Sequence, residues 1–109
     1  MKPGRLFLFG IYGTTPRRDT VSLLKESGAA GVLLLGRNIE TAAQTKALIS
    51  GLEQKLGRRL LVSIDHEGGW VLRFKAGVSA TPGNAALGRL KDERLSYETG
   101  KLMGQELSA

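Results

Sequence analysis

The sequence predicts an α/β fold built from three successive β-strand–α-helix units. Three short apolar runs recur along the chain, and each is followed by a turn and then by a stretch with helical spacing. The runs do not alternate between apolar and polar residues, which is typical of strands buried on both faces of a parallel sheet. Strands that alternate with helices call for right-handed crossovers. Two architectures of this kind remain open at this point, a doubly wound sheet and a (β/α)8 barrel.

The first unit comprises a strand over residues 5–11 and a helix that ends near Ser27. Thr15 is a good N-cap, and Pro16 at the first helical position loses no N–H that the helix needs. Gly28 fits the position that follows the last helical turn.

The second unit comprises a strand over residues 31–35, a loop over 36–38 and a helix that ends at Gly57. Thr41 and Gln44 have the spacing of a capping box, which indicates that the helix begins just after Thr41. Four apolar residues at helical spacing form the stripe expected to be buried: Leu48, Ile49, Leu52 and Leu56.

The third unit begins with a strand over residues 60–64 and ends with a helix over 91–107. Between them lies a glycine-rich loop over residues 66–88, part of which (70–74) is expected to be extended or briefly helical. A loop of this length inside a compact domain is usually either functional or disordered.

Composition excludes several classes of protein. The 109 residues contain no cysteine, so a disulfide scaffold and a thiolate metal site are excluded, and a reducing, cytoplasmic location is expected. No apolar run is long enough to span a membrane, so no membrane partner is expected. The net charge is +6, but the basic residues are dispersed and lack interleaved aromatic residues. They are interpreted as a solvated surface, and nucleic acid is not expected as a partner.

No cofactor is expected either. The turn after the first predicted strand reads Gly10-Ile-Tyr-Gly13, which does not match the glycine fingerprint of dinucleotide-binding folds. No phosphate-binding P-loop motif occurs elsewhere in the chain.

The segment over residues 64–74 carries the most informative chemistry. Asp65 ends the third predicted strand at its carboxyl end, which is where α/β folds bind ligands. Gly68 and Gly69 permit a tight turn or the close approach of a ligand, and Arg73 can then fold back beside Asp65. A carboxylate and a guanidinium together suit a polyhydroxylated ligand such as a sugar. The alternative is a structural ion pair that orders the loop.

This segment, IDHEGGWVLRF, resembles the Asp-Gln-Glu-Gly-Gly-Arg-Val-x-Arg-Phe signature of glycoside hydrolase family 3, in its bacterial β-N-acetylhexosaminidase (β-N-acetylglucosaminidase) branch. Residues 31–39, GVLLLGRNI, are similar to the family's Gly-Val-Ile-Leu-Phe-x-Arg-Asn-Ile. Further matches follow the family's order: Gln44, Leu48, Thr81-Pro82, Ala86–Gly88, Gly100 and Glu106-Leu107. The resemblance implies that residues 1–109 are the N-terminal part of the family's barrel domain, truncated at the C-terminus, with the first three units of an incomplete (β/α)8 barrel.

The resemblance also implies roles for matching residues. Asp65 and Arg73 stand where the family contacts the sugar substrate. Glu67 and the two glycines after it are interpreted as shaping the loop, and the matching pair Arg37 and Asn38 as structural.

Two residues depart from the family's pattern. His66 replaces a glutamine and is interpreted as a loop or pocket-wall residue, because the family's acid/base histidine comes from a later loop. Trp70 replaces an arginine and is a possible pocket-wall residue, which either offers an apolar platform for a sugar ring or packs under the loop. A metal site at residues 65–67 is not expected, since consecutive residues of an extended chain point in opposite directions.

The implied function is that of a retaining glycosidase that removes terminal β-linked N-acetylglucosamine, as in peptidoglycan recycling, with a small saccharide as substrate. Retention requires two catalytic groups across the scissile bond. In the family both lie well after the third strand, the acid/base histidine on a later loop with a motif like Lys-His-Phe-Pro-Gly-His-Gly. Neither motif occurs in these 109 residues, so no catalytic residue is expected in this chain, which alone should be inactive. Unpaired strand edges predict that it self-associates. The alternatives are β-glucosidase-type specificity and a non-catalytic α/β binding module.

Overall fold

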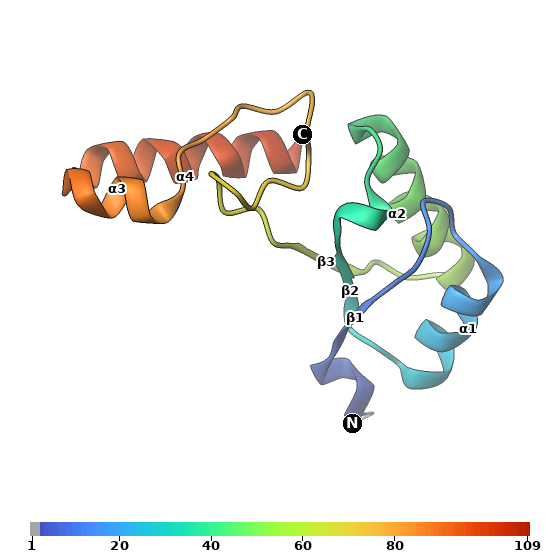
Figure 1. The fold of residues 1–109 in the computed structure, drawn as a ribbon. Helices are drawn as coiled ribbons and strands as arrows, with labels where there is room; N and C mark the ends of the chain where they lie inside the picture. The colour runs from blue at the N-terminus through green and yellow to red at the C-terminus, as the bar shows by residue number, and fades with distance from the viewer. Residues whose placement is uncertain (1–2) are drawn as a thin grey trace. The chain divides into compact units, whose positions relative to one another are not determined.

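The computed structural model describes residues 3–109, which form two compact units. Unit 1 extends to Ile64 and unit 2 runs from Asp65 to Ala109. Along unit 1 the elements are η1 (Pro3–Leu6), β1 (Leu8–Gly10), α1 (Arg18–Ser27), β2 (Gly31–Leu34), η2 (Gly36–Asn38), α2 (Ala42–Leu56) and β3 (Leu61–Ile64) (Figure 1). Unit 2 contains α3 (Asn84–Leu90) and α4 (Glu93–Ser108).

The three strands form one parallel sheet in the order β1-β2-β3. Gly31 in the central strand is in register with Leu8 on one side and with Leu61 on the other. A Cβ atom on Gly31 would lie 1.7 Å from the carbonyl oxygen of Leu61, so only glycine fits there. The predicted α/β class with a parallel sheet is therefore confirmed.

Both helices of unit 1 pack on the same face of this sheet. Val32 and Leu34 point to one side of β2 and are almost completely buried. They belong to one core cluster with residues from both helices and from the strand ends: Ile11, Leu24, Ala29, Leu48, Leu52 and Leu60. In Figure 1, α1 and α2 accordingly lie on the same side of the strands.

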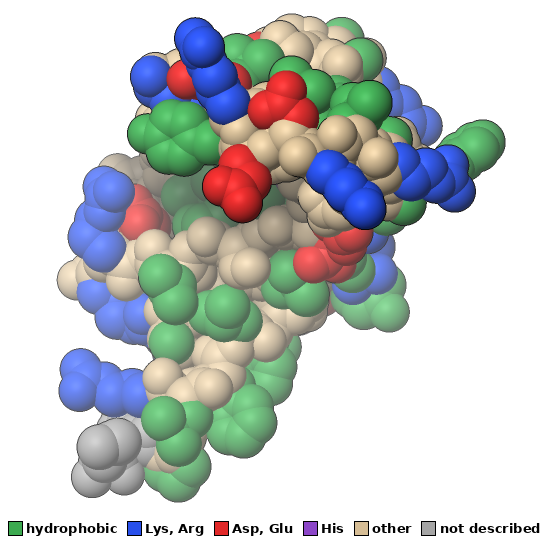
Figure 2. All heavy atoms as spheres, turned by 90° about the vertical axis from the view of Figure 1, so that its left-hand side faces the viewer, with side chains coloured by type: hydrophobic (Ala, Val, Ile, Leu, Met, Phe, Trp, Pro, Cys, Tyr) green, Lys and Arg blue, Asp and Glu red, His purple; other side chains and the backbone are tan. Residues whose placement is uncertain are grey.

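The prediction that all three strands are buried on both faces is wrong for β1 and β3. Leu8 is 36% exposed and Leu61 is 62% exposed, whereas β2 between them is mostly buried. The reason is that no element of the described part of unit 1 covers the face opposite the helices. Hydrophobic side chains are visible together on this side of unit 1 in Figure 2.

Helix ends that depend on a single residue follow the prediction. Gly28 and Gly57 adopt left-handed backbone conformations, with φ of 66° and 67°, after α1 and α2. The Thr41 hydroxyl accepts a hydrogen bond of 3.0 Å from the backbone N–H of Gln44. The Gln44 side chain closes the motif through the N–H of Glu40, one residue before the expected partner.

The first predicted unit is wrong at two boundaries. Arg5 and Leu6 belong to η1 and not to the strand, because the chain turns there and Phe7 N–H donates to the carbonyl of Gly4. Helix α1 begins at Arg18 and not at Pro16. A bidentate pair between Arg17 and Asp19, at 2.9 and 3.1 Å, occupies the start of this helix instead of a threonine cap.

The end of the chain contains two helices where one was predicted. The predicted loop over 66–88 includes the first five residues of α3, and the predicted helix over 91–107 corresponds to α4. Lys91, with φ of 51°, ends α3, and the Asp92 carboxylate caps α4 by accepting from Leu95 N–H at 2.9 Å. None of the helices in residues 3–109 has the length and apolar content needed to cross a membrane.

Candidate functional site

The predicted site residues Asp65 and Arg73 lie together in unit 2. Asp65 directly follows the last residue of β3, and its Oδ2 atom lies 3.7 Å from Nη2 of Arg73. A charge-assisted hydrogen bond would be about 2.7–2.9 Å long. The two side chains therefore form an ion pair that leaves most of their hydrogen-bonding capacity free. They are 53% and 31% exposed, so a ligand can reach both.

The loop that carries this pair is shaped by two glycines. Gly68 and Gly69 have φ of 81° and 58°, which side-chain-bearing residues rarely adopt. The N–H of Gly69 donates to the carbonyl of Thr81 at 2.9 Å. A Cβ atom on Gly68 would lie 2.4 Å from the carbonyl oxygen of Pro82, so a larger residue would separate these two segments.

His66 is buried and holds the backbone of Arg73. Its Nδ1 atom accepts a hydrogen bond of 3.2 Å from the N–H of Arg73, and its ring lies edge-on to Phe74. His66 also lines a cavity of about 480 Å³ in unit 2, together with Glu67, Asn84, Leu87, Gly88, Ser96, Thr99, Gly100 and Met103. With one ring nitrogen engaged by the backbone, the residue positions the loop beside Asp65.

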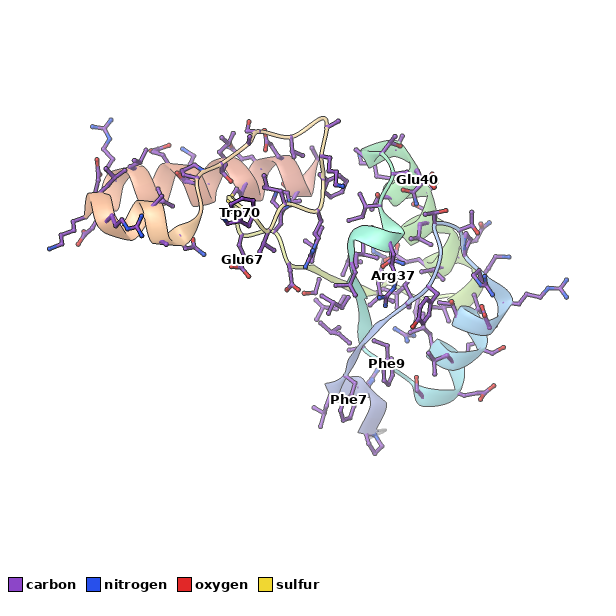
Figure 3. The ribbon with its side chains drawn as sticks, viewed as in Figure 1. Phe7, Phe9, Arg37, Glu40, Glu67 and Trp70 are labelled. Carbon is purple, nitrogen blue, oxygen red and sulfur yellow. The ribbon has the colours of Figure 1, made fainter. Side chains whose placement is uncertain are left out.

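Trp70 is fully exposed and is not among the residues that line this cavity. The alternative that it packs under the loop is therefore wrong, and its role as a platform for a sugar ring stays a prediction. Figure 3 shows Trp70 and Glu67 on the loop after β3.

Two buried polar atoms of unit 2 have no hydrogen-bond partner. They are Nε of Arg73 and Oγ1 of Thr81. Burying a donor without a partner costs about 1–3 kcal/mol. Because this Nε atom is buried, only the exposed part of the Arg73 side chain can reach a ligand.

Arg37 and Asn38 make structural hydrogen bonds in unit 1. The Asn38 side chain is completely buried, accepts from Leu35 N–H, and donates to the carbonyls of Ile11 and Gly13. Arg37 also donates to the carbonyl of Ile11, at 2.9 Å. These bonds join the segment after β1 to the segment after β2, as the structural interpretation requires.

A contact that the sequence did not reveal anchors the far side of the loop. Glu106 in α4 accepts hydrogen bonds from the N–H of Ser79 and from its hydroxyl, the latter at 2.6 Å. These bonds lower the pKa of Glu106 from its ordinary value. The two residues are 27 positions apart and belong to no local motif. Within residues 3–109, no three His, Asp or Glu side chains are arranged to hold a metal ion.

Comparisons with known proteins agree on one family. Residues 3–109 match the model of the glycosyl hydrolase family 3 N terminal domain. A β-hexosaminidase of Xylella fastidiosa strain M23 is 36% identical over 95% of this chain and 33% of its own length. A β-hexosaminidase of Methylobacillus flagellatus is 32% identical over 94% of this chain and 31% of its own. The chain thus spans about a third of the length of the curated relatives it matches.

Solved structures give the same result. A glycoside hydrolase family 3 β-N-acetylglucosaminidase from Paenibacillus sp. str. FPU-7 superposes with a TM-score of 0.90 at 37% identity, covering 98% of this chain and 21% of that one. NagZ from Neisseria gonorrhoeae, in complex with zinc ion, superposes with a TM-score of 0.79 at 25% identity, covering 93% of this chain and 32% of that one.

Proposed function

The chain belongs to glycoside hydrolase family 3, and from that membership we propose that it forms the N-terminal part of a retaining glycosidase. The proposed reaction hydrolyses the glycosidic bond of a terminal β-linked N-acetylglucosamine in a small saccharide, such as a cell-wall fragment. Relatives named β-hexosaminidase and β-N-acetylglucosaminidase support this substrate class. The absence of cysteine is compatible with a cytoplasmic location.

The observation that carries the proposal is the Asp65–Arg73 pair at the carboxyl end of β3. A structural ion pair would be expected to close to hydrogen-bond length, yet these groups stay 3.7 Å apart. Two other hydrogen bonds order the loop. The N–H of Gly69 donates to the carbonyl of Thr81, and the N–H of Arg73 donates to Nδ1 of His66. Its charged pair is therefore available for sugar hydroxyls, with the carboxylate accepting and the guanidinium donating.

The strand order and the position of the helices favour a (β/α)8 barrel rather than a doubly wound sheet. In a doubly wound sheet the strand order reverses and helices cover both faces. Here the order β1-β2-β3 follows the chain, and α1 and α2 pack on one face. Leu8 and Leu61 are exposed on the other face, which in a barrel is the interior.

Residues 1–109 supply substrate contacts and neither member of the catalytic pair. This part of the proposal is supported by the sequence, in which the family's Lys-His-Phe-Pro-Gly-His-Gly motif does not occur. It is also consistent with the chain spanning about a third of its curated relatives. Purified alone, the chain is expected to release no chromophore from an aryl N-acetylglucosaminide.

The test uses the full-length protein and the substitution Asp65→Asn, which keeps the shape of the side chain and removes its charge. Hydrogen bonds to a charged group contribute about 1.5–3 kcal/mol, so kcat/KM for an aryl N-acetylglucosaminide should fall about 10- to 150-fold. Calorimetry with N-acetylglucosamine and with glucose distinguishes the proposed specificity from that of a β-glucosidase.

Glu98→Gln is the matched control, because it removes a carboxylate from an exposed position of α4 in the same unit, outside the loop and the cavity. It should leave kcat/KM within about threefold of the parent protein, since an exposed charge of this kind contributes little. Equal losses for both variants, or none for Asp65→Asn, would show that Asp65 does not bind the sugar.

A further inference from the structure

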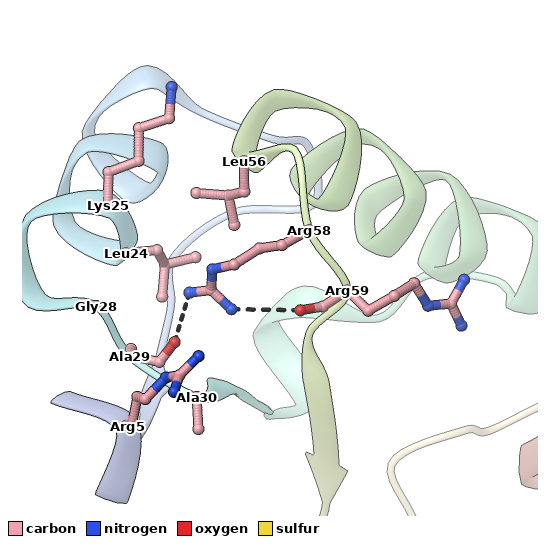
Figure 4. Close-up of a pocket in the computed structure, with 9 residues that line it drawn as sticks. All are labelled: Arg5, Leu24, Lys25, Gly28, Ala29, Ala30, Leu56, Arg58 and Arg59. Atoms are coloured by element: carbon pink, nitrogen blue, oxygen red, sulfur yellow. Dashed lines mark hydrogen bonds between the residues drawn. The ribbon is translucent and has the colours of Figure 1, made fainter. Parts of the chain in front are cut away.

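Unit 1 contains a cavity of about 810 Å³ at the amino end of its strands (Figure 4). Nine residues line it: Arg5, Leu24, Lys25, Gly28, Ala29, Ala30, Leu56, Arg58 and Arg59. They come from η1, the end of α1, the end of α2 and the segments that precede β2 and β3. The proposed sugar-binding pair follows the opposite, carboxyl end of β3, so the two features are separate.

The walls of this cavity are held in place by the backbone. The N–H of Ala30 donates to the carbonyls of Gly4 and Phe7, which fixes η1 and with it Arg5. A Cβ atom on Gly4 would lie 1.7 Å from the carbonyl oxygen of Ser27, so this close approach of η1 to the end of α1 requires glycine.

Arg58 extends across the cavity between the ends of α1 and α2. Its guanidinium donates to the carbonyls of Ala29 and Arg59, as the dashed lines in Figure 4 show. Backbone carbonyls orient the group without neutralising its full charge. Arg58 is thus positioned before any ligand arrives.

Positive charge in the cavity exceeds the nearby negative charge. Among residues 3–109, no carboxylate lies within ion-pair distance of Arg5, Lys25 or Arg58. Glu53 pairs with Arg59 at 3.3 Å and also accepts from the N–H of Leu60. The two helix ends each contribute about half a negative charge, so about two positive charges remain uncompensated.

The same cavity has an apolar part. Leu56 and Ala30 are partly exposed beside the cations, whereas Leu24 and Ala29 are completely buried behind them. Pockets for small molecules typically have volumes of about 300–1,000 Å³ and combine apolar walls with a few placed polar groups. The cavity has a volume within that range, and four of its nine lining residues are cationic.

We propose that this cavity binds a small phosphate monoester with an apolar ester group. A phosphate monoester carries about −1.5 to −2 charges at neutral pH, which matches the uncompensated charge. The planar guanidinium of Arg58 suits two phosphate oxygens at once, and Arg5 and Lys25 contribute at the rim. The proposal is independent of the sugar site, whose ligand is recognised through neutral hydroxyls.

Calorimetric titration of the protein with phenyl phosphate at constant ionic strength tests the proposal. Saturable binding with one site per chain is expected. The double variant Arg5→Gln/Lys25→Gln should weaken it at least about tenfold, because each lost charge–phosphate contact contributes about 1 kcal/mol or more. Neither side chain makes a hydrogen bond in the part of the chain that the structure describes, so the variant should fold, which circular dichroism checks.

Arg18→Gln/Lys46→Gln is the matched control, since it removes the same net charge from exposed positions outside the cavity. It should keep the affinity within about twofold. Inorganic phosphate should bind more weakly than phenyl phosphate, and phenol should not bind measurably. The proposal is overturned if phenyl phosphate gives no saturable binding, if the control loses as much affinity as the site variant, or if phenol binds equally well.

Discussion

Replacing Asn38 by alanine should destabilise unit 1 strongly. The Asn38 side chain is completely buried and forms three hydrogen bonds with backbone groups of Leu35, Ile11 and Gly13. The Ile11 carbonyl keeps a second donor in Arg37, so two backbone groups lose their only side-chain partner. At about 1–3 kcal/mol for each unsatisfied group, the free energy of unfolding should fall by about 2–6 kcal/mol.

Urea titration followed by circular dichroism measures this loss. For a small protein with an m-value near 1.5 kcal/mol/M, a loss of 3 kcal/mol lowers the midpoint by about 2 M. Gln54→Ala is the control, because Gln54 is exposed on α2 and its side chain has no hydrogen bond among residues 3–109. If the two variants unfold within about 0.3 M of each other, the buried hydrogen bonds of Asn38 do not stabilise the fold.

Three further predictions concern the loop, the pH dependence and the assembly state. Gly68→Ala should cost about 2–5 kcal/mol, because a left-handed backbone costs a side chain about 1–2 kcal/mol and the new methyl group, 2.4 Å from the carbonyl oxygen of Pro82, adds about 1–3 kcal/mol of overpacking. Gly57→Ala, with a similar φ but nothing within 4 Å of the methyl group, should cost only about 1–2 kcal/mol by the same urea titration. Hydrogen bonds from Ser79 hold the pKa of Glu106 below 4.5, so their stabilisation is present above that pH and is lost as the pH falls through the lower folded-state value. Glu106→Gln should therefore reduce the acid-side loss of stability, measured as urea midpoints from about pH 5 to about pH 3, and an unchanged profile would contradict this. The exposed sheet face should make the chain self-associate in sedimentation experiments, whereas a monodisperse monomer that melts cooperatively would argue against it.

Helix ends were predictable where one residue determines the backbone. Gly28, Gly57 and Thr41 act through their own conformation or hydroxyl group, and a local sequence contains that information. The start of α1 was not predictable, because the ion pair of Arg17 with Asp19 competes with the threonine and proline signals.

Helix α3 and the burial of the outer strands were missed for different reasons. Gly83 and Gly88 suggested a loop, but Gly83 is the N-cap of α3 and Gly88 lies within that helix. Burial depends on what covers a face. The sequence shows that Leu8 and Leu61 are apolar, but the residues around them in sequence do not show which elements would cover them.

The ion pair in the candidate site was predictable because both residues flank one glycine turn. Asp65 and Arg73 are close in sequence, and the two glycines between them allow the chain to reverse. The hydrogen bonds that Ser79 donates to Glu106 and the approach of Arg5 to Arg58 at the same cavity were not predictable. Each joins segments that are distant in sequence, so no local motif contains the information.

The turn at Gly68 and Gly69 is fixed by contacts between backbone atoms, and this affects how the loop can vary. Because the N–H of Gly69 and the carbonyl of Thr81 define the turn, its outer side chain takes no part in forming it. Trp70 occupies that outer position and is fully exposed. Substitutions at Trp70 can therefore change the surface that the loop presents to solvent, while the positions of Asp65 and Arg73 stay the same.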